Sequence, residues 1–360
     1  MKITDVKATG LAQTTQTVVQ VYTDEGLVGV GHSDSSPYVR YIIEGELKPL
    51  VQGEDPLEVG KLWTKMYRAV SWHGFRGITL HGMAGIDMAL WDLAGQKLGQ
   101  PVWKLLGGRF RDRVTPYASL GFHGEADWLK REAAKYRDLG FRAEKFGWGP
   151  FGRVSVEKDE EMVKAVRESA GEEMKLIIDA GRPPDANASR MIQTARRIEK
   201  YNVFFLEEPV TPDDIDGLAE ARAAVDIPIA SGETMGSTYE FKELIDRRAV
   251  DIVQPDPSRV GLTQWKQIAK MAEQANMLCI PHDWSTGINI VAQIHLVASI
   301  PNGEYIEYHR PEPGQETEAA IMDELLMEPF ELKNGYFEVP NKPGLGITLN
   351  EKTLKRYGVR

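Results

Sequence analysis

From residue 113 onward, short apolar runs alternate with charged segments of helical period, and no other feature constrains the fold of this chain as strongly. Eight runs have the length of a strand and end in polar residues; they cover residues 113–119, 141–146, 174–180, 203–209, 227–233, 250–256, 277–283 and 304–309. Repeated strand–helix units predict parallel strands, and eight units predict a barrel. An open doubly wound sheet is the alternative, but that fold usually carries a glycine-rich phosphate turn after its first strand, and none follows residue 119.

The first part of the chain has a different pattern, in which strands come before helices. Residues 3–8 and 17–23 alternate between apolar and polar positions, and a turn at residues 24–26 leads into a third strand over 27–31. Helical periodicity then runs from about residue 38 to residue 99. We therefore predict an α+β domain over 1–112, a barrel over 113–320, and a segment over 321–360 that returns to the first domain.

The composition narrows the possible classes of function. Acidic residues outnumber basic residues by 53 to 43, and the formal net charge is −10. Because such a charge repels phosphate backbones and anionic lipid, we expect no nucleic-acid partner and no membrane partner. The single cysteine, Cys279, excludes an intramolecular disulfide. Since the sequence shows no apolar signal core and no run of about 18 apolar residues, we expect a cytoplasmic protein.

Side chains that could act in catalysis or bind a metal ion stand at or near the ends of seven predicted strands. They are spaced 23 to 34 residues apart, about one strand–helix unit each: Lys145, Asp179, Glu207, Glu233, Asp256, His282 and Glu307. The carboxyl ends of barrel strands meet at one face, which is where barrel enzymes place their active sites. Five carboxylates gathered there would repel one another unless a cation lay among them.

Two groups within this set suggest specific chemistry. Asp179, Glu207 and Glu233 offer only hard oxygen ligands, which suit Mg²⁺; the alternative is that each acid merely caps the following helix. Asp256 and His282 end adjacent predicted strands, so a carboxylate–imidazole hydrogen bond could make His282 a general base or acid. A structural role for the histidine is the alternative.

Several motifs, in their order and spacing, resemble the enolase superfamily and within it the mandelate racemase-like subgroup. They are the stretches at residues 85–92, 105–108, 207–209, 232–234, 254–256, 281–282 and 343–346. The resemblance implies an α/β fold, a (β/α)₇β TIM-like barrel with an α+β capping domain, and one Mg²⁺ held by the three acids. It also implies removal of a proton α to a carboxylate, giving an enediolate. A homo-oligomer is expected on the same ground.

The resemblance assigns roles to two further residues and exposes one departure. Lys145 would act as a fixed cation, and Glu307 as a hydrogen-bonding partner that must be protonated to donate. Family members with a base on the second barrel strand carry Lys-x-Lys, but here Gly147 stands in place of the second lysine. His282 is then the one good base, which disfavours racemisation because racemases need a base on each face of the α-carbon.

A single histidine suits elimination of water from a β-hydroxy acid. We therefore expect a hydro-lyase that resembles the acid-sugar dehydratases and converts an aldonate or aldarate, a small-molecule carboxylate, into a 2-keto-3-deoxy acid. Two alternatives stay open. One is an epimerase or racemase in which Lys145 or another group serves the second face. The other is a catalytically silent metal-binding protein on the same fold.

The resemblance also implies that loops of the capping domain lie over the barrel mouth, where they could bind the substrate together with residues next to the strand ends. In the capping domain the candidate residues are His32, His73 and Arg76; next to the strand ends they are Trp148, Asp283 and Trp284. His73 and Arg76 could bind sugar hydroxyls or a distal carboxylate, and the second group could form the wall of the pocket. The alternative is that they are ordinary solvated loop residues, because loops are polar by default.

Overall fold

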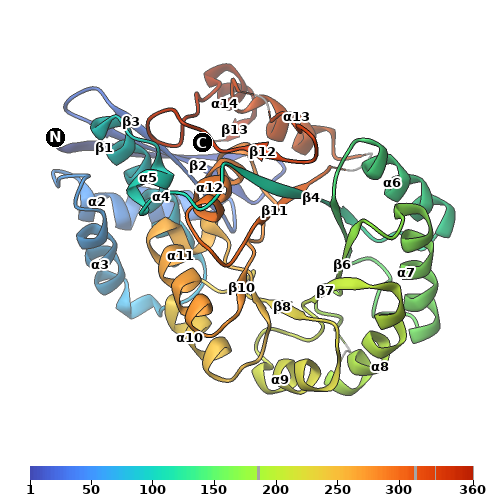
Figure 1. Cartoon of the computed structure of the whole chain (residues 1–360). Coiled ribbons are helices and arrows are strands. Elements are labelled where there is room, and N and C mark those ends of the chain that lie inside the picture. The colour runs from blue at the N-terminus through green and yellow to red at the C-terminus, as the bar shows by residue number, and fades with distance from the viewer. Residues whose placement is uncertain (185–186, 312–313, 329, 360) are drawn as a thin grey trace.

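The computed structural model describes residues 1–184, 187–311, 314–328 and 330–359 (Figure 1). The capping domain contains an antiparallel sheet of order β13-β1-β2-β3, with strands at Ile3–Leu11 (β1), Gln16–Thr23 (β2), Val28–Asp34 (β3) and Gly358–Val359 (β13). Its helical segments are α1 (Val39–Ile42), the π-helix η1 (Ile43–Leu47), α2 (Lys48–Val51), α3 (Val59–Ala69), the 3₁₀-helix η2 (Ser71–His73), α4 (Ile78–Leu98) and α5 (Val102–Leu105).

The second unit is a curled parallel sheet surrounded by helices. Its strands are β4 (Arg113–Gly121), β5 (Ala143–Gly147), β6 (Lys175–Asp179), β7 (Val203–Glu207), β8 (Ile229–Ser231), β9 (Ile252–Val253), β10 (Leu278–Cys279) and β11 (Tyr305–His309). The strand order is β10-β9-β8-β7-β6-β5-β4-β11. At the ends of this order, Cys279 N of β10 donates at 2.9 Å to Asn302 O, in the segment that leads into β11. The predicted barrel with an α+β capping domain is confirmed.

Each barrel strand from β4 to β10 is followed by a helix that covers the outside of the sheet (Figure 1). These helices are α6 (Ala126–Asp138), α7 (Val156–Ala170), α8 (Ala188–Ile198), α9 (Ile215–Ala224), α10 (Thr238–Asp246), α11 (Pro257–Gln274) and α12 (Gly287–Ala298), with the 3₁₀-helix η3 (Glu199–Tyr201) after α8. None of the helices in the described part of the chain is long and apolar enough to cross a membrane.

The helix α4 is buried on nearly all sides and contacts both units. It packs against β3, where a Cβ built on Gly31 would lie 2.0 Å from Gly85 O of the helix. Only glycine allows this approach between strand and helix. On the barrel side, Asp87 of α4 accepts hydrogen bonds from Thr263 N at 2.9 Å and Thr263 Oγ1 at 2.6 Å. The capping domain is thereby fixed relative to α11.

The C-terminal segment contacts both sheets. It comprises α13 (Glu316–Glu324), β12 (Phe337–Glu338), α14 (Glu351–Tyr357) and β13. The strand β12 pairs antiparallel with β4 of the barrel, and β13 pairs antiparallel with β1 of the capping domain. The domain boundaries at residues 112/113 and 320/321 stay predictions.

Three barrel strands are shorter than the apolar runs that predicted them. The ladders of β8, β9 and β10 end before Glu233, Asp256 and His282, which therefore lie in loops. Gly232 has a φ of 124°, a value that interrupts the β8 strand. Residues 255 and 281 are prolines, which lack the N–H that a sheet ladder needs. Because these strands end early, the three residues lie in loops at the rim of the barrel.

Candidate active site

The inward-facing side chains converge at the barrel mouth because side chains alternate along a strand with a period of two. A layer of buried apolar side chains crosses the barrel interior: Tyr117, Ala143, Ile177, Phe205, Ala230, Ile252 and Ile280. The next inward positions, two residues later, include Lys145, Asp179, Glu207 and His282. The apolar layer therefore closes the floor beneath these polar groups.

Asp179, Glu207 and Glu233 form a buried carboxylate cluster in which one oxygen of each lies within 4.8 Å of the others. Burial raises the pKa of Asp179 to about 6, although Lys145 opposes the shift. Burial also raises the pKa of Glu207 well above its usual range. Burial also raises the pKa of Glu233, but the nearby cationic groups, His282 and Arg182 foremost, outweigh this effect and bring the pKa below its usual value. A hard divalent cation prefers oxygen ligands and would relieve the repulsion among these carboxylates. The carboxylate cluster therefore fits such a cation.

Lys145 lies among the carboxylates. Its Nζ is 3.0 Å from both carboxylate oxygens of Glu207, 2.7 Å from Glu307 Oε1 and 3.5 Å from Asp179 Oδ2. Burial lowers the pKa of Lys145, but the charges of Glu207 and Glu307 raise it well above its usual value. Lys145 is therefore a fixed ammonium group.

Glu307 accepts hydrogen bonds from three sides. Ser119 Oγ donates to Oε1 at 2.6 Å, while Asp283 N donates to Oε2 at 2.9 Å and Tyr117 OH lies 3.2 Å from the same oxygen. Burial raises the pKa of Glu307, but Lys145, His282 and Ser119 together lower it to below its usual range. The expectation of a protonated Glu307 is wrong for this structure, because Lys145 and these donors compensate its charge.

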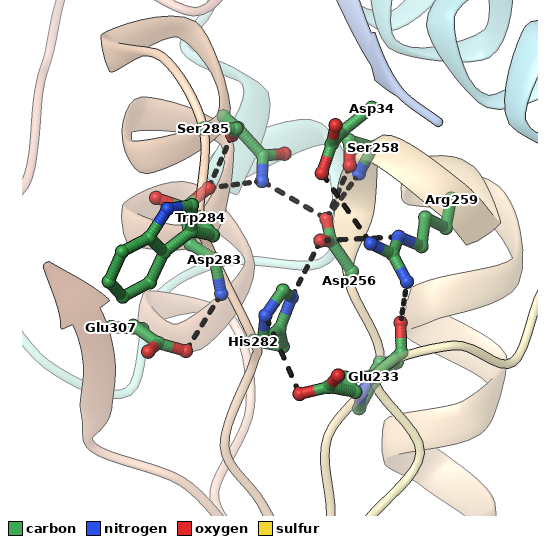
Figure 2. A network of polar contacts seen from close by, with 12 residues as sticks. Asp34, Glu233, Asp256, Ser258, Arg259, His282, Asp283, Trp284, Ser285 and Glu307 are labelled. Carbon is green, nitrogen blue, oxygen red and sulfur yellow. Dashed lines mark hydrogen bonds and ion pairs between the residues drawn. The ribbon is translucent and has the colours of Figure 1, made fainter. Parts of the chain in front are cut away.

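His282 and Asp256 lie in contact, as Figure 2 shows. Asp256 Oδ2 is 2.9 Å from His282 Nδ1, and because a carboxylate only accepts, Nδ1 carries the hydrogen. The other nitrogen, Nε2, lies 3.6 Å from Glu233 Oε2. Burial lowers the pKa of His282, but Glu233 and the hydrogen bond to Asp256 outweigh it and raise the pKa to about 10. Burial raises the pKa of Asp256, but His282, Arg259 and Ser258 together lower it to below its usual range, so Asp256 stays ionised.

A network of donors fixes the other oxygen of Asp256. Its Oδ1 accepts from Ser258 N at 2.8 Å and Ser258 Oγ at 2.7 Å (Figure 2). It also accepts from Asn289 Nδ2 at 3.0 Å. Asn289 also donates to Asp283 Oδ1 at 2.6 Å. These bonds hold the Asp256 carboxylate in one orientation, and through it the imidazole ring of His282.

A cavity of about 440 Å³ opens above these groups. Its lining includes six of the predicted residues, Lys145, Trp148, Asp179, Glu233, His282 and Trp284. Four more lie next to these residues without lining the cavity: Glu207, Asp256 and Glu307 contact lining residues, and Asp283 contacts Glu307. The structure thus brings together ten of the thirteen residues singled out from the sequence.

The remaining three, all in the capping domain, do not line this cavity. His32 is fully buried, and burial lowers its pKa to about 4. His73 lies at the surface with Nδ1 3.2 Å from Glu46 Oε2. Arg76 is also at the surface, with Nε 3.2 Å from Glu240 Oε1. The chain between α3 and α4 points these two side chains toward acidic partners outside the cavity, and their substrate-binding role stays a prediction.

Two arginines that line the cavity, Arg182 and Arg259, are not among the residues predicted from the sequence. Arg182 Nη2 lies 3.1 Å from Glu233 Oε1, and Arg259 Nη1 donates to Glu233 O at 2.9 Å. Each arginine follows by three residues an aspartate at a predicted strand end, Asp179 and Asp256 respectively, and this repeated spacing was the available signal. Arg182 also has a φ of 52°, a left-handed conformation that costs free energy for a residue with a side chain.

Gly147 lines the cavity next to the carboxylate cluster. It pairs with Asp179 across the β5–β6 ladder. A Cβ built on Gly147 would lie 2.6 Å from Asp179 Cβ and 2.9 Å from Asp179 Oδ2. A longer side chain at this position therefore requires Asp179 to move. The site thus differs from one in which the second lysine of Lys-x-Lys occupies this position.

Family models match nearly the whole chain. Residues 4–107 match the mandelate racemase/muconate lactonizing enzyme N-terminal domain, and residues 128–353 match the enolase C-terminal domain-like family. Among curated proteins, the chain is 35% identical to arabinonate dehydratase of Saccharolobus solfataricus, covering 97% of this chain and 92% of the relative. It is 33% identical to D-galactarolactone cycloisomerase of Agrobacterium fabrum, covering 94% and 90%.

A solved structure shows the same architecture over the full length. The 3,6-anhydro-D-galactonate cycloisomerase of Zobellia galactanivorans superposes with a TM-score of 0.92 at 32% identity, covering 100% of both chains. The matches confirm the expected family and support the expected hydro-lyase class. The chain belongs to the mandelate racemase-like subgroup of the enolase superfamily.

Proposed function

We propose that this protein is a Mg²⁺-dependent dehydratase that removes water from an acid sugar, an aldonate or aldarate, to give a 2-keto-3-deoxy acid. The observation that carries the proposal is the asymmetry of the cavity. One side carries the His282–Asp256 pair, and the position where relatives place a second base is Gly147, packed against Asp179. One base suffices for elimination, whereas inversion at the α-carbon requires two.

His282 is the proposed general base. Its Nδ1–H is committed to Asp256, so Nε2 is the nitrogen that receives the α-proton. The electron pair of the C–H bond enters the substrate carboxylate and then forms the double bond between the α- and β-carbons as the β-hydroxyl leaves. The same imidazolium can return the proton to that hydroxyl in a syn elimination, so that water departs and the enol tautomerises.

Lys145 is the proposed electrostatic partner of the substrate carboxylate. An enediolate carries more charge on its oxygens than the starting carboxylate, so a fixed ammonium stabilises it more than the substrate. Glu307 positions this ammonium through its 2.7 Å contact and is itself held by Ser119 and the backbone of Asp283.

Asp179, Glu207 and Glu233 would hold the Mg²⁺. Bound there, the ion supplies Lewis-acid stabilisation of the developing charge and offsets the negative charge of Glu233. Glu233 is the largest contributor that raises the pKa of His282, so neutralising it favours the uncharged imidazole that a base requires. Arg182 and Arg259 contact Glu233 from two directions and keep it aligned.

A screen tests the proposal directly. The purified protein with Mg²⁺ is incubated with a panel of aldonic and aldaric acids, and keto-acid formation is followed as the semicarbazone. We expect turnover of at least one acid, loss of turnover in His282→Asn, and unchanged Mg²⁺ binding by that variant. Retained activity in His282→Asn, or keto-acid formation that does not depend on Mg²⁺, would refute the assigned roles.

A second candidate, an isomerase, is favoured by one observation: two of the similar proteins are named cycloisomerases. Such an enzyme also needs one proton acceptor at the α-carbon. The same panel, extended with the lactones and anhydro acids, separates the two reactions, because an isomerase gives a product of unchanged mass whereas a dehydratase gives a product lighter by one water.

A further inference from the structure

We propose that the substrate carries one carboxylate and an uncharged polyol chain, an aldonate rather than an aldarate, and that Asp34 of the capping domain excludes a second carboxylate. This inference rests on the proposed function and names the substrate class for the same cavity.

Asp34 brings a negative side chain to the cavity from the capping domain. It is the last residue of β3 and lines the cavity. Thr15 Oγ1 donates to its Oδ1 at 2.5 Å, and Arg259 Nη2 lies 3.5 Å from its Oδ2 (Figure 2 shows the arginine contact). Its side chain is only 6% exposed. A charge held in so buried a position is weakly screened and repels another anion strongly.

The position of Asp34 is fixed by contacts between the capping domain and the barrel. Gln16, which pairs with Asp34 across the β2–β3 ladder, donates from Nε2 to Trp284 O at 3.0 Å. Arg259 bonds both Asp34 and the backbone of Glu233. Asp34 therefore cannot withdraw from the cavity without breaking contacts to the two loops that carry His282 and Glu233.

The cationic groups that line the cavity already have anionic partners among the described residues. Lys145 contacts Glu207 and Glu307, and His282 contacts Asp256. Arg182 contacts Glu233 and Glu208, and Arg259 contacts Asp34. The first substrate carboxylate is served by Lys145 and the cation that the carboxylate cluster would hold. A second carboxylate would have to break one of these buried pairs, which is costly.

The same groups suit a neutral chain of hydroxyls. The carboxylate of Asp34 accepts hydrogen bonds from hydroxyl groups, and the Thr15 hydroxyl, whose hydrogen goes to Asp34, can accept another. The indole rings of Trp148 and Trp284 also line the cavity and offer apolar surface to the C–H faces of a polyol. Repulsion of the wrong ligand, combined with hydrogen bonds to the right one, is how sites usually acquire specificity.

The test compares matched pairs of acids. With Mg²⁺, kcat/KM is measured for C5 and C6 aldonates and for the aldarates of the same configuration, in the wild type, in Asp34→Asn and in the control Asp213→Asn. Asp213 is exposed and does not line the cavity, so this control makes the same change in net charge. Affinities of the same acids are measured by calorimetry, so that the comparison does not depend on turnover.

We expect the wild type to prefer the aldonate by about 100-fold, the size of a buried like-charge penalty. Asp34→Asn should reduce that preference by about 10-fold or more, by improving the aldarate, while Asp213→Asn should leave it unchanged. Equal or better use of aldarates by the wild type would overturn the inference and leave the dehydratase proposal standing. Should no acid sugar be turned over, the proposed function fails, and tighter binding of aldarates than of aldonates would then also refute the role of Asp34.

Discussion

Replacing Asp256 with Asn tests the histidine–carboxylate pair without changing its size. In the wild type, Oδ1 of Asp256 accepts from Ser258 N, Ser258 Oγ and Asn289 Nδ2, while Oδ2 accepts from His282 Nδ1. An asparagine side chain has one acceptor oxygen and one donor nitrogen. Two of the three donors on the first side are N–H groups that cannot become acceptors, so the amide oxygen must face them.

The amide NH₂ of Asp256→Asn then faces His282 Nδ1. This nitrogen must accept, and the ring hydrogen moves to Nε2, the atom that should receive the α-proton. The variant thus holds the imidazole in place but in the wrong tautomer. Loss of a general base costs about 10² to 10⁴ in rate, which corresponds to about 3–5 kcal/mol in the activation free energy.

The assay is kcat for keto-acid formation on the best acid of the panel, with Mg²⁺ affinity measured in parallel. Mg²⁺ affinity should be unchanged, because Asp256 is outside the carboxylate cluster. The matched control is Ser258→Ala, which removes one hydroxyl donor and should cost no more than about 5-fold, the value of one hydrogen bond. A kcat for Asp256→Asn within 10-fold of the wild type would refute the tautomer argument.

Three further predictions concern stability. Burial lowers the pKa of His295 to about 4. Its contribution of about 3 kcal/mol to the free energy of unfolding is therefore present above pH 6.5 and is lost as the pH falls from 6.5 to 4. Denaturant titrations should show the free energy of unfolding falling over this range in the wild type and falling less in His295→Gln. Gly181→Ala should destabilise the protein by about 1–3 kcal/mol, because φ of Gly181 is 59° and the new Cβ would lie 2.6 Å from the Trp148 ring. The control Gly45→Ala should cost less, because a Cβ on Gly45 would have no neighbour within 4 Å. Equal denaturation midpoints for the two variants would contradict this prediction. Mg²⁺ at 100 times its Kd should stabilise the wild type by about 2.7 kcal/mol, and an equal gain in Glu207→Gln would argue against the carboxylate cluster as the binding site.

The barrel and the convergence of its polar groups could be predicted because both follow from periodicity. Alternation along a strand fixes which residues face inward, so Lys145, Asp179 and Glu207 needed only the correct strand positions. The exact ends of β8, β9 and β10 could not be predicted, since loops and prolines replace the ladder there. The residues of interest remained at the mouth regardless.

The capping-domain contacts were harder to predict because they depend on tertiary packing. His32 and Asp34 lie two residues apart on β3 and so share a face, yet only Asp34, at the strand end, reaches the cavity. Likewise the orientation of Arg76 depends on the position of Glu240, which is distant in sequence. The ionised state of Glu307 depends on the distance to Lys145, which no sequence pattern contains.

The central claim is that one base acts on one face of the substrate, and proton NMR of the reaction in D₂O tests it most directly. We expect a 2-keto-3-deoxy acid that carries deuterium at C3 and unreacted substrate that keeps its configuration at C2. Accumulation of the C2 epimer with deuterium at that carbon, without keto acid, would contradict it.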